Sequence, residues 1–220
     1  MQLKEPKLNR DQSKALASTK FLNLYDLAYE NGVHYYDASR RKPDTLFAYM
    51  DKDKLGKELP DAATAFVIVK EQGQADKLLL FYEYRYPTGS YMLGLPAGLI
   101  DPADLKKENP ILDAMKREIK EETGLTVKDT DQMEVLSHLV FTATGFSDES
   151  NALVKAVVHV DDLSELNHNG AEGTELFGDF KLVDQAEAKR LLKNGRDDYG
   201  HYLPLVTWTA LTYFVSDLWK

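Results

Sequence analysis

Runs of hydrophobic residues along the chain predict a succession of short strands. Strands are expected where aliphatic and aromatic residues dominate a segment that ends in Gly, Pro, Asn or Asp. Near the N-terminus, residues 20–29 and 33–38 flank the turn-like Glu30-Asn31-Gly32 and predict a β-hairpin. Further strands are predicted at 45–50, 63–70, 77–85, 91–101, 132–140 and 151–160, and the segment 91–101 runs into a Pro-Ala-Gly corner.

Helical patterning is clearest over residues 110–123. Asn109 is the expected N-cap, proline suits the first helical position, and Gly124 suits the position just after the last turn. Two more helices are predicted at 184–193 and in the apolar segment 203–218. Strands interleaved with a few helices are typical of an α/β or α+β sandwich.

A charged, turn-rich segment at 51–62 separates the two parts of this pattern and is the candidate linker. We therefore divide the chain into a small β-rich appendage, residues 1–60, and a main domain, residues 61–220. At 220 residues the chain is long enough for one substantial core with such an appendage.

The helix at 110–123 carries an unusual arrangement of acids. Glu118 and Glu122 lie one turn apart, and no lysine or arginine stands three or four residues from either. Arg117 and Glu121 are also one turn apart, but their charges are opposite. The two remaining glutamates border the apolar stripe formed by Ile111, Met115 and Ile119, where desolvation strengthens their repulsion. Either this is a solvated acidic face, or a divalent cation lies between the two carboxylates.

Composition and charge narrow the classes of function. The net charge of −9 disfavours binding to a nucleic-acid backbone, and no apolar run approaches the roughly 20 residues that a membrane span requires. Cysteine is absent, which excludes disulfides and thiolate zinc sites, and the N-terminus has no signal-peptide pattern, so a cytoplasmic protein is expected. A chain this acidic would need a metal cation to handle phosphates.

The stretch Arg117–Leu125, REIKEETGL, resembles the second half of the box that defines the Nudix hydrolase family. That half reads Arg-Glu-aliphatic-x-Glu-Glu-x-Gly-aliphatic, and Gly98 fits the glycine that opens the box. The segment 99–116 is five residues longer than its counterpart in the family. The first glutamate of the box therefore has two candidates here, Asp104 and Glu108.

The resemblance implies a Nudix-type α/β/α sandwich with a mixed sheet, and a metal site on the helix. Glu118 and Glu122 would be the principal ligands, Glu121 a further ligand or catalytic group, and the carbonyl of Ala97 another oxygen ligand. Arg117 would hold the glutamates in position. Oxygen ligands of this kind suit Mg²⁺ or Mn²⁺, which keep positions for water and substrate phosphate.

Two further stretches resemble the ADP-ribose and nucleoside-diphosphate-sugar pyrophosphatases of this family. In YEYRYPTGSYMLGLPAGLID, Arg85 occupies the position of a substrate-binding arginine, and Gly98 would also border the substrate. In TATGFSDES, Glu149 would be the catalytic base or a ligand. The chain departs from the subfamily at Thr144, where proline is frequent, and at Gly94, where glutamate is frequent.

The resemblance thus implies hydrolysis of ADP-ribose to AMP and ribose 5-phosphate. The alternatives are another substrate, such as a nucleotide sugar or a dinucleoside polyphosphate, and a non-catalytic sensor that binds ADP-ribose. Sensors tend to lose glutamates of the box, which this chain retains. The appendage resembles one that commonly builds a homodimer, with Arg41, Tyr35 and Tyr36 as candidates for substrate contact, although packing in the hairpin core is the alternative for both tyrosines.

Overall fold

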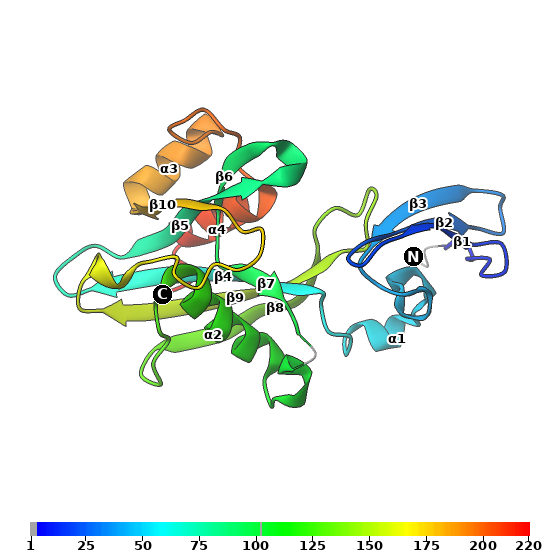
Figure 1. Ribbon diagram of the computed structural model, residues 1–220, viewed down its shortest axis with the longest axis horizontal. Helices are drawn as coiled ribbons and strands as arrows, with labels where there is room; N and C mark the ends of the chain where they lie inside the picture. Colours follow the sequence, from blue (N-terminus) through cyan, green and yellow to red (C-terminus); the bar gives the residue numbers. More distant parts are fainter. Residues whose placement is uncertain (1–3, 102) are drawn as a thin grey trace. The chain divides into compact units, whose positions relative to one another are not determined.

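The computed structural model describes residues 4–101 and 103–220, and the chain forms two compact units (Figure 1). The first contains the residues up to Asp61 together with His138–Ala152, and the second contains Ala62–Ser137 and Leu153–Lys220. The expected division into an appendage, residues 1–60, and a main domain, residues 61–220, did not include the grouping of residues 138–152 with the N-terminal part.

The first unit is built on a three-stranded antiparallel sheet in the order β1-β2-β3. The strands are β1 (Lys14–Ser18), β2 (Asn23–Ala28) and β3 (His34–Ser39). The β2–β3 hairpin is the predicted one, and its turn contains Gly32 at φ +79°. Strand β1 was not predicted. The buried core of this unit contains Tyr25, Leu27 and Leu46.

The strand predicted at 45–50 is wrong. The segment instead forms two short 3₁₀ turns, η1 (Pro43–Thr45) and η2 (Phe47–Tyr49), before the one-turn helix α1 (Lys52–Leu55). Leu46 and Phe47 are adjacent and both buried, whereas a strand would direct them to opposite faces. The turns allow Leu46 to pack with Tyr25 and Leu27 while Phe47 packs edge-on against Phe141, at 5.0 Å between ring centroids.

The second unit is built on a seven-stranded sheet whose main path is β10-β5-β4-β9-β8, with β6 paired to β5 and β7 paired to β4. The strands are β4 (Ala62–Glu71), β5 (Lys77–Arg85), β6 (Ser90–Gly94), β7 (Ala97–Leu99), β8 (Gln132–Phe141), β9 (Ser150–Val160) and β10 (Phe177–Val183). All but β10 were predicted, and the expected strand at 91–101 is divided into β6 and β7. Short 3₁₀ turns lie at η3 (Tyr86–Thr88), η4 (Asp104–Lys106) and η5 (Leu163–Glu165).

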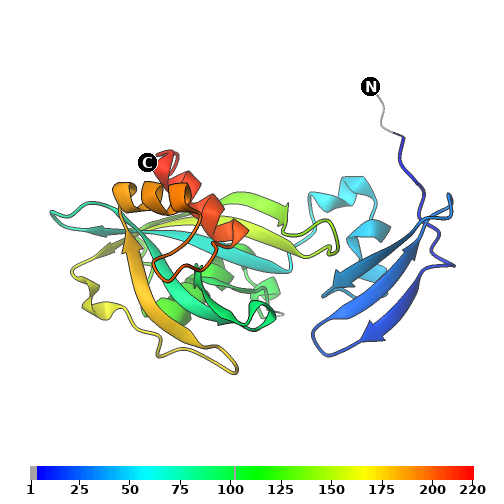
Figure 2. The ribbon, with the colours of Figure 1, turned by 90° about the horizontal axis from the view of Figure 1, so that it is seen from above.

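Helices cover both faces of this sheet (Figure 2). Helices α3 (Gln185–Asn194) and α4 (Leu205–Val215) pack on one face, where their core contains Phe66, Ile68, Leu78, Leu80, Leu191 and Phe214. The alternate residues Val67, Leu79 and Phe81 are also buried and face the other side, which α2 (Pro110–Thr123) covers. The mixed α/β architecture agrees with the predicted fold class. Over residues 4–101 and 103–220, no helix is both long and apolar enough to cross a membrane.

The predicted ends of α2 are confirmed. Asn109 occupies the N-cap position, but its side chain makes no capping hydrogen bond, contrary to expectation. Gly124 ends the helix at φ +77°, and a Cβ there would lie only 2.2 Å from Nδ2 of Asn167. The amide of Asn167 donates to the carbonyl of Thr123 at 3.0 Å. The loop after β9 thus fixes the last turn of α2, which carries the acidic residues.

Candidate active site

The acidic turns of α2 lie against the corner between β6 and β7. Glu118 is 8% exposed, and a Cβ built on Gly98 would lie 1.9 Å from Oε1 of Glu118. No side chain of any size fits at position 98 unless this carboxylate moves. The glycine that opens the sequence motif is therefore needed for the close approach of the helix glutamate to the strand.

Glu122 is held against the same corner, one residue earlier. Its Oε2 accepts a hydrogen bond from the amide of Ala97 at 3.0 Å, and the residue is 5% exposed. The structure therefore brings Ala97, Gly98, Glu118 and Glu122 together, as the sequence motif predicts. Binding of a metal ion by these groups, including the carbonyl of Ala97, stays a prediction.

The electrostatics of the two buried carboxyls are unfavourable. Burial raises the pKa of Glu118 to about 7, with added repulsion from Glu121 and Glu175 and opposition from Arg117. Burial raises the pKa of Glu122 to about 9, because the hydrogen bond from Ala97 only partly offsets the desolvation and the charges of Glu118, Glu83 and Glu175. Two such groups beside each other are unstable as anions unless a cation joins them.

Arg117 contacts Glu118 and further acidic side chains near it. Its Nη1 lies 2.8 Å from Oε1 of Glu118 and 3.0 Å from Oε2 of Glu121, and its Nη2 lies 3.4 Å from Oδ2 of Asp104. These contacts fit the expected role of Arg117 in holding the glutamates, which itself stays a prediction. The side chain of Glu121 is 38% exposed, so a route from solvent to its carboxylate remains.

Asp104 is the better placed of the two candidates for the first acid of the motif. It is 1% exposed, whereas Glu108 is exposed. Burial alone would raise the pKa of Asp104, but hydrogen bonds from Lys107, the amide of Asp101 and Arg117 outweigh that effect and lower it. The five-residue insertion thus leaves Asp104 in contact with Arg117.

The donor set fits a hard divalent cation. The available groups are carboxylate and backbone oxygens, and the two buried glutamates face a glycine that leaves room for them. Within residues 4–101 and 103–220, no group of three or more His, Asp or Glu side chains converges closely enough to form a complete ligand set. Such a site would therefore depend on two carboxylates, a backbone oxygen and water, which is common for Mg²⁺.

Arg85 is the last residue of β5, where it pairs with Ser90 of β6, and its ion-pair partner was not identified from the sequence. The Nη2 of Arg85 lies 2.7 Å from Oε2 of Glu83, whose side chain is only 14% exposed, while the side chain of Arg85 is 46% exposed. Burial raises the pKa of Glu83 against the opposing charge of Arg85. A glutamate in a buried strand, two residues before the predicted phosphate-binding arginine, was the available signal.

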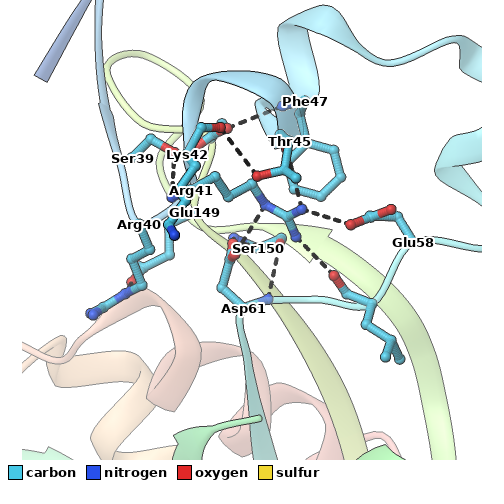
Figure 3. A network of polar contacts seen from close by, with 12 residues as sticks. Ser39, Arg40, Arg41, Lys42, Thr45, Phe47, Glu58, Asp61, Glu149 and Ser150 are labelled. Carbon is cyan, nitrogen blue, oxygen red and sulfur yellow. Dashed lines mark hydrogen bonds and ion pairs between the residues drawn. The ribbon is translucent and has the colours of Figure 1, made fainter. Parts of the chain in front are cut away.

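Arg41 and Glu149 belong to the first unit. Figure 3 shows the guanidinium of Arg41 directed between Glu58 and Asp61, with which it forms ion pairs of 2.8 and 3.0 Å, and its side chain is only 8% exposed. Glu149 forms an ion pair of 2.7 Å with Arg40. The contacts of Arg41 are those of a structural residue, and the roles expected for Arg41 and Glu149 toward substrate stay predictions.

Tyr35 and Tyr36 do not pack in the hairpin core. They are 50% and 62% exposed, and they line a cavity of about 230 Å³ in the first unit together with Phe146 and Asp37. On a strand, adjacent residues point to opposite sides, so a single hairpin core cannot take both tyrosines. Their position leaves them available for contact with another molecule.

The second unit is thus an α/β sandwich, a mixed sheet between helices, in which two buried glutamates of α2 lie against Ala97 and Gly98. The family profile described as "NUDIX domain" matches residues 58–206. The chain belongs to the Nudix family.

Two curated proteins are similar to parts of this chain. The putative nudix hydrolase 2 of Caenorhabditis elegans is 36% identical over 137 residues, which cover 61% of this chain and 56% of that protein. The ADP compounds hydrolase NudE of Escherichia coli strain K12 is 37% identical over 79 residues, or 36% of this chain and 38% of that protein. The matched segments thus span less than two thirds of either relative.

The crystal structure of an ADP compounds hydrolase has the same fold. It superposes with a TM-score of 0.58 at 20% sequence identity, and the match covers 98% of this chain and 97% of that one. At this level of identity the likeness supports the fold alone.

Proposed function

We propose that the protein hydrolyses, with Mg²⁺ or Mn²⁺, a nucleoside diphosphate linked to another moiety, and that its substrate is ADP-ribose, which yields AMP and ribose 5-phosphate. The observation that carries this proposal is the burial of Glu118 and Glu122 against Ala97 and Gly98. A family fold alone would not support an activity, because one fold hosts many functions.

The residues of the site have separate tasks in this reaction. Glu118 and Glu122 would bind the cation, and Arg117 keeps the carboxylate of Glu118 in place through its 2.8 Å contact. When bound, the ion neutralises charge on the diphosphate and lowers the pKa of a coordinated water. Arg85 is half-exposed and offers a planar pair of N–H donors that matches two phosphate oxygens.

The choice of ADP-ribose has narrower support. It comes from the segments around Arg85 and Glu149 that resemble this subfamily, and from a relative whose name states that it hydrolyses ADP compounds. Glu149 is proposed as the catalytic base on that resemblance.

The test is an assay of the purified protein with Mg²⁺ against ADP-ribose, nucleotide sugars and dinucleoside polyphosphates, with chromatographic identification of the phosphomonoesters. Glu122→Gln removes a ligand charge at nearly constant volume, and we expect turnover to fall about 100-fold or more with an unchanged circular dichroism spectrum. Glu172→Gln, an exposed glutamate of the same unit, is the control and should retain activity.

The outcomes separate the alternatives. Cleavage of a different diphosphate compound in preference to ADP-ribose would keep the hydrolase and replace the substrate. Binding of ADP-ribose without any release of AMP would identify a sensor. Near-normal activity of Glu122→Gln would contradict the assignment of the metal site.

A further inference from the structure

Gly94 leaves a gap on the face of the sheet that α2 covers. The residue is buried at the end of β6 and pairs with Phe81 on the neighbouring strand β5. A Cβ at position 94 would lie 3.5 Å from Oε2 of Glu83 and 3.6 Å from the ring of Phe81, which are ordinary contact distances. The space where a side chain of Gly94 would begin is thus bordered by the carboxylate of Glu83.

The register of β5 and β6 explains how Glu83 reaches this place. Glu83 pairs directly with Met92 and lies two residues from Phe81, so Glu83 and Phe81 share one face and Gly94 is the diagonal neighbour of Glu83. A Cβ at position 94 would only touch the carboxylate, so an alanine would fit beside it. A larger residue at position 94 would compete with Glu83 for the same space.

The chain from Gly94 to Gly98 therefore contacts carboxylates from two different elements. Glu83 of β5 borders Gly94. On α2, Glu122 accepts a hydrogen bond from the amide of Ala97, and Glu118 lies against Gly98. Arg85 forms an ion pair with Glu83, and Arg117 forms one with Glu118.

We propose that the carboxylate of Glu83 contributes to cation binding at the metal centre. From β5, it would replace the glutamate that is frequent in related pyrophosphatases at the position of Gly94. The inference rests on the proposed function, because it concerns the cation held by Glu118 and Glu122. Among the described residues no three acidic side chains converge closely enough to ligate one ion, so Glu83 would act through a bound water. A further negative charge at that distance from a divalent ion still strengthens its binding.

This role also connects the metal ion to Arg85. In the structure, Arg85 is the counter-charge of Glu83, at 2.7 Å. A divalent cation attracts the same carboxylate, which weakens its hold on the guanidinium. Arg85 is then available for the phosphate of the substrate, so that metal binding prepares the phosphate contact.

The experiment measures Mn²⁺ affinity without substrate, by calorimetry and by electron paramagnetic resonance, for the parent and four single variants: Glu83→Gln, Arg85→Gln, Glu122→Gln and Glu172→Gln. We expect Glu83→Gln to weaken Mn²⁺ binding about tenfold, and Arg85→Gln to leave it equal or tighter because a nearby positive charge is lost. Glu172→Gln should match the parent. If Glu83 only held Arg85 in place, Glu83→Gln would leave Mn²⁺ affinity unchanged.

A transposed carboxylate provides the second test. In the double variant Glu83→Ala with Gly94→Glu, the acid moves across the strand pair into space that the first change has opened. We expect it to regain the Mn²⁺ affinity that Glu83→Ala alone loses, with near-ultraviolet circular dichroism as the check on folding. If the folded double variant binds no better than Glu83→Ala, Glu83 does not stand in for Gly94.

The two proposals fail in distinguishable ways. A parent protein that binds no Mn²⁺ would overturn the proposed function together with this inference. A parent that binds Mn²⁺ and loses it in Glu122→Gln, but not in Glu83→Gln, would overturn the role of Glu83 alone. A loss in Arg85→Gln as large as that in Glu83→Gln would also overturn it, because the ion pair would then act as a structural unit.

Discussion

Ionisation of the buried carboxyl of Glu122 costs free energy, and the size of that cost depends on the groups around it in the folded chain. Its hydrogen bond from Ala97 is the only favourable contribution among the causes that shift its pKa, and burial outweighs it. Glu118 has Arg117 beside it and is shifted less, to a pKa of about 7. The charge of Arg117 thus partly offsets the burial of Glu118, whereas among the described residues no positive charge offsets that of Glu122 one turn later. A bound cation would therefore lower the pKa of Glu122 most.

At the residue scale we predict that the stability of the metal-free protein falls as pH rises. Burial raises the folded pKa of Glu122 from 4.5 to about 9, so the native state binds more protons than the unfolded state between these values. The stabilising contribution of the protonated form is complete below the unfolded pKa and is lost as pH rises through the folded one. Thermal unfolding in chelator from about pH 5 to about pH 9 would measure it.

Glu122→Gln is the matched control, because it cannot titrate. Its melting temperature should decline less with pH than that of the parent, and the difference between the two should change across the range set by Glu122. Parallel curves for parent and variant would show that Glu122 is ionised at neutral pH without a metal. Added Mn²⁺ should stabilise the parent more strongly at higher pH, because its ligands must lose their protons.

At the element scale, α2 depends on the loop that follows β9. Gly124 has φ +77°, and a Cβ at this position would also lie 2.6 Å from the carbonyl oxygen of Glu165. Gly170 approaches the same helix, since its Cβ would lie 2.5 Å from the carbonyl oxygen of Glu121. The last turn of α2, which carries Glu121 and Glu122, is therefore enclosed by the side chain of Asn167 and by the backbone at Glu165 and Gly170.

The two glycines that end α2 and α3 provide a controlled comparison. Gly195 ends α3 at φ +67°, but nothing lies within 4 Å of a Cβ built there. We predict that Gly195→Ala costs about 1 kcal/mol, the strain of the left-handed conformation alone. Gly124→Ala should cost more than about 2 kcal/mol, because the loop must also move. Urea unfolding would measure both, and equal losses would show that the loop contacts contribute nothing.

At the scale of the whole molecule, the first unit exposes a set of apolar side chains on and around its three-stranded sheet. They are Leu16, Phe21, Leu22, Leu24, Val33, Tyr35 and Tyr36, each more than a third exposed. A gathering of apolar side chains on one small unit is typical of an interface. It supports the homodimer expected from the resemblance of this appendage to those of related enzymes.

We predict that the protein sediments as a dimer and that Leu22→Asp shifts it toward monomer, because a charge would be buried in the interface. Leu218→Asp is the control, since Leu218 is also an exposed leucine, at 73% against 49%, but belongs to the second unit. Sedimentation velocity at several concentrations would measure the shift. A parent protein that remains monomeric throughout would contradict the proposal.

The sequence by itself determined the features of this protein that depend on neighbouring residues. Pro110 and Gly124 set both ends of α2, and the spacing of Glu118 and Glu122 placed them on the border of its apolar stripe, where the structure finds them buried. These outcomes follow from helical periodicity and from the backbone preferences of proline and glycine, which act over a single turn.

The tertiary structure alone decided the features that depend on pairing between distant segments. It buried Asp104 and left Glu108 exposed, made β10 a strand through its pairing with β5, and brought Glu83 to Gly94. It also turned 45–50 into helical turns, in which the adjacent residues Leu46 and Phe47 are both buried, Leu46 with Tyr25 and Leu27 and Phe47 against Phe141. Strand pairing and burial are set by residues far apart in the chain, so local sequence patterns do not contain them.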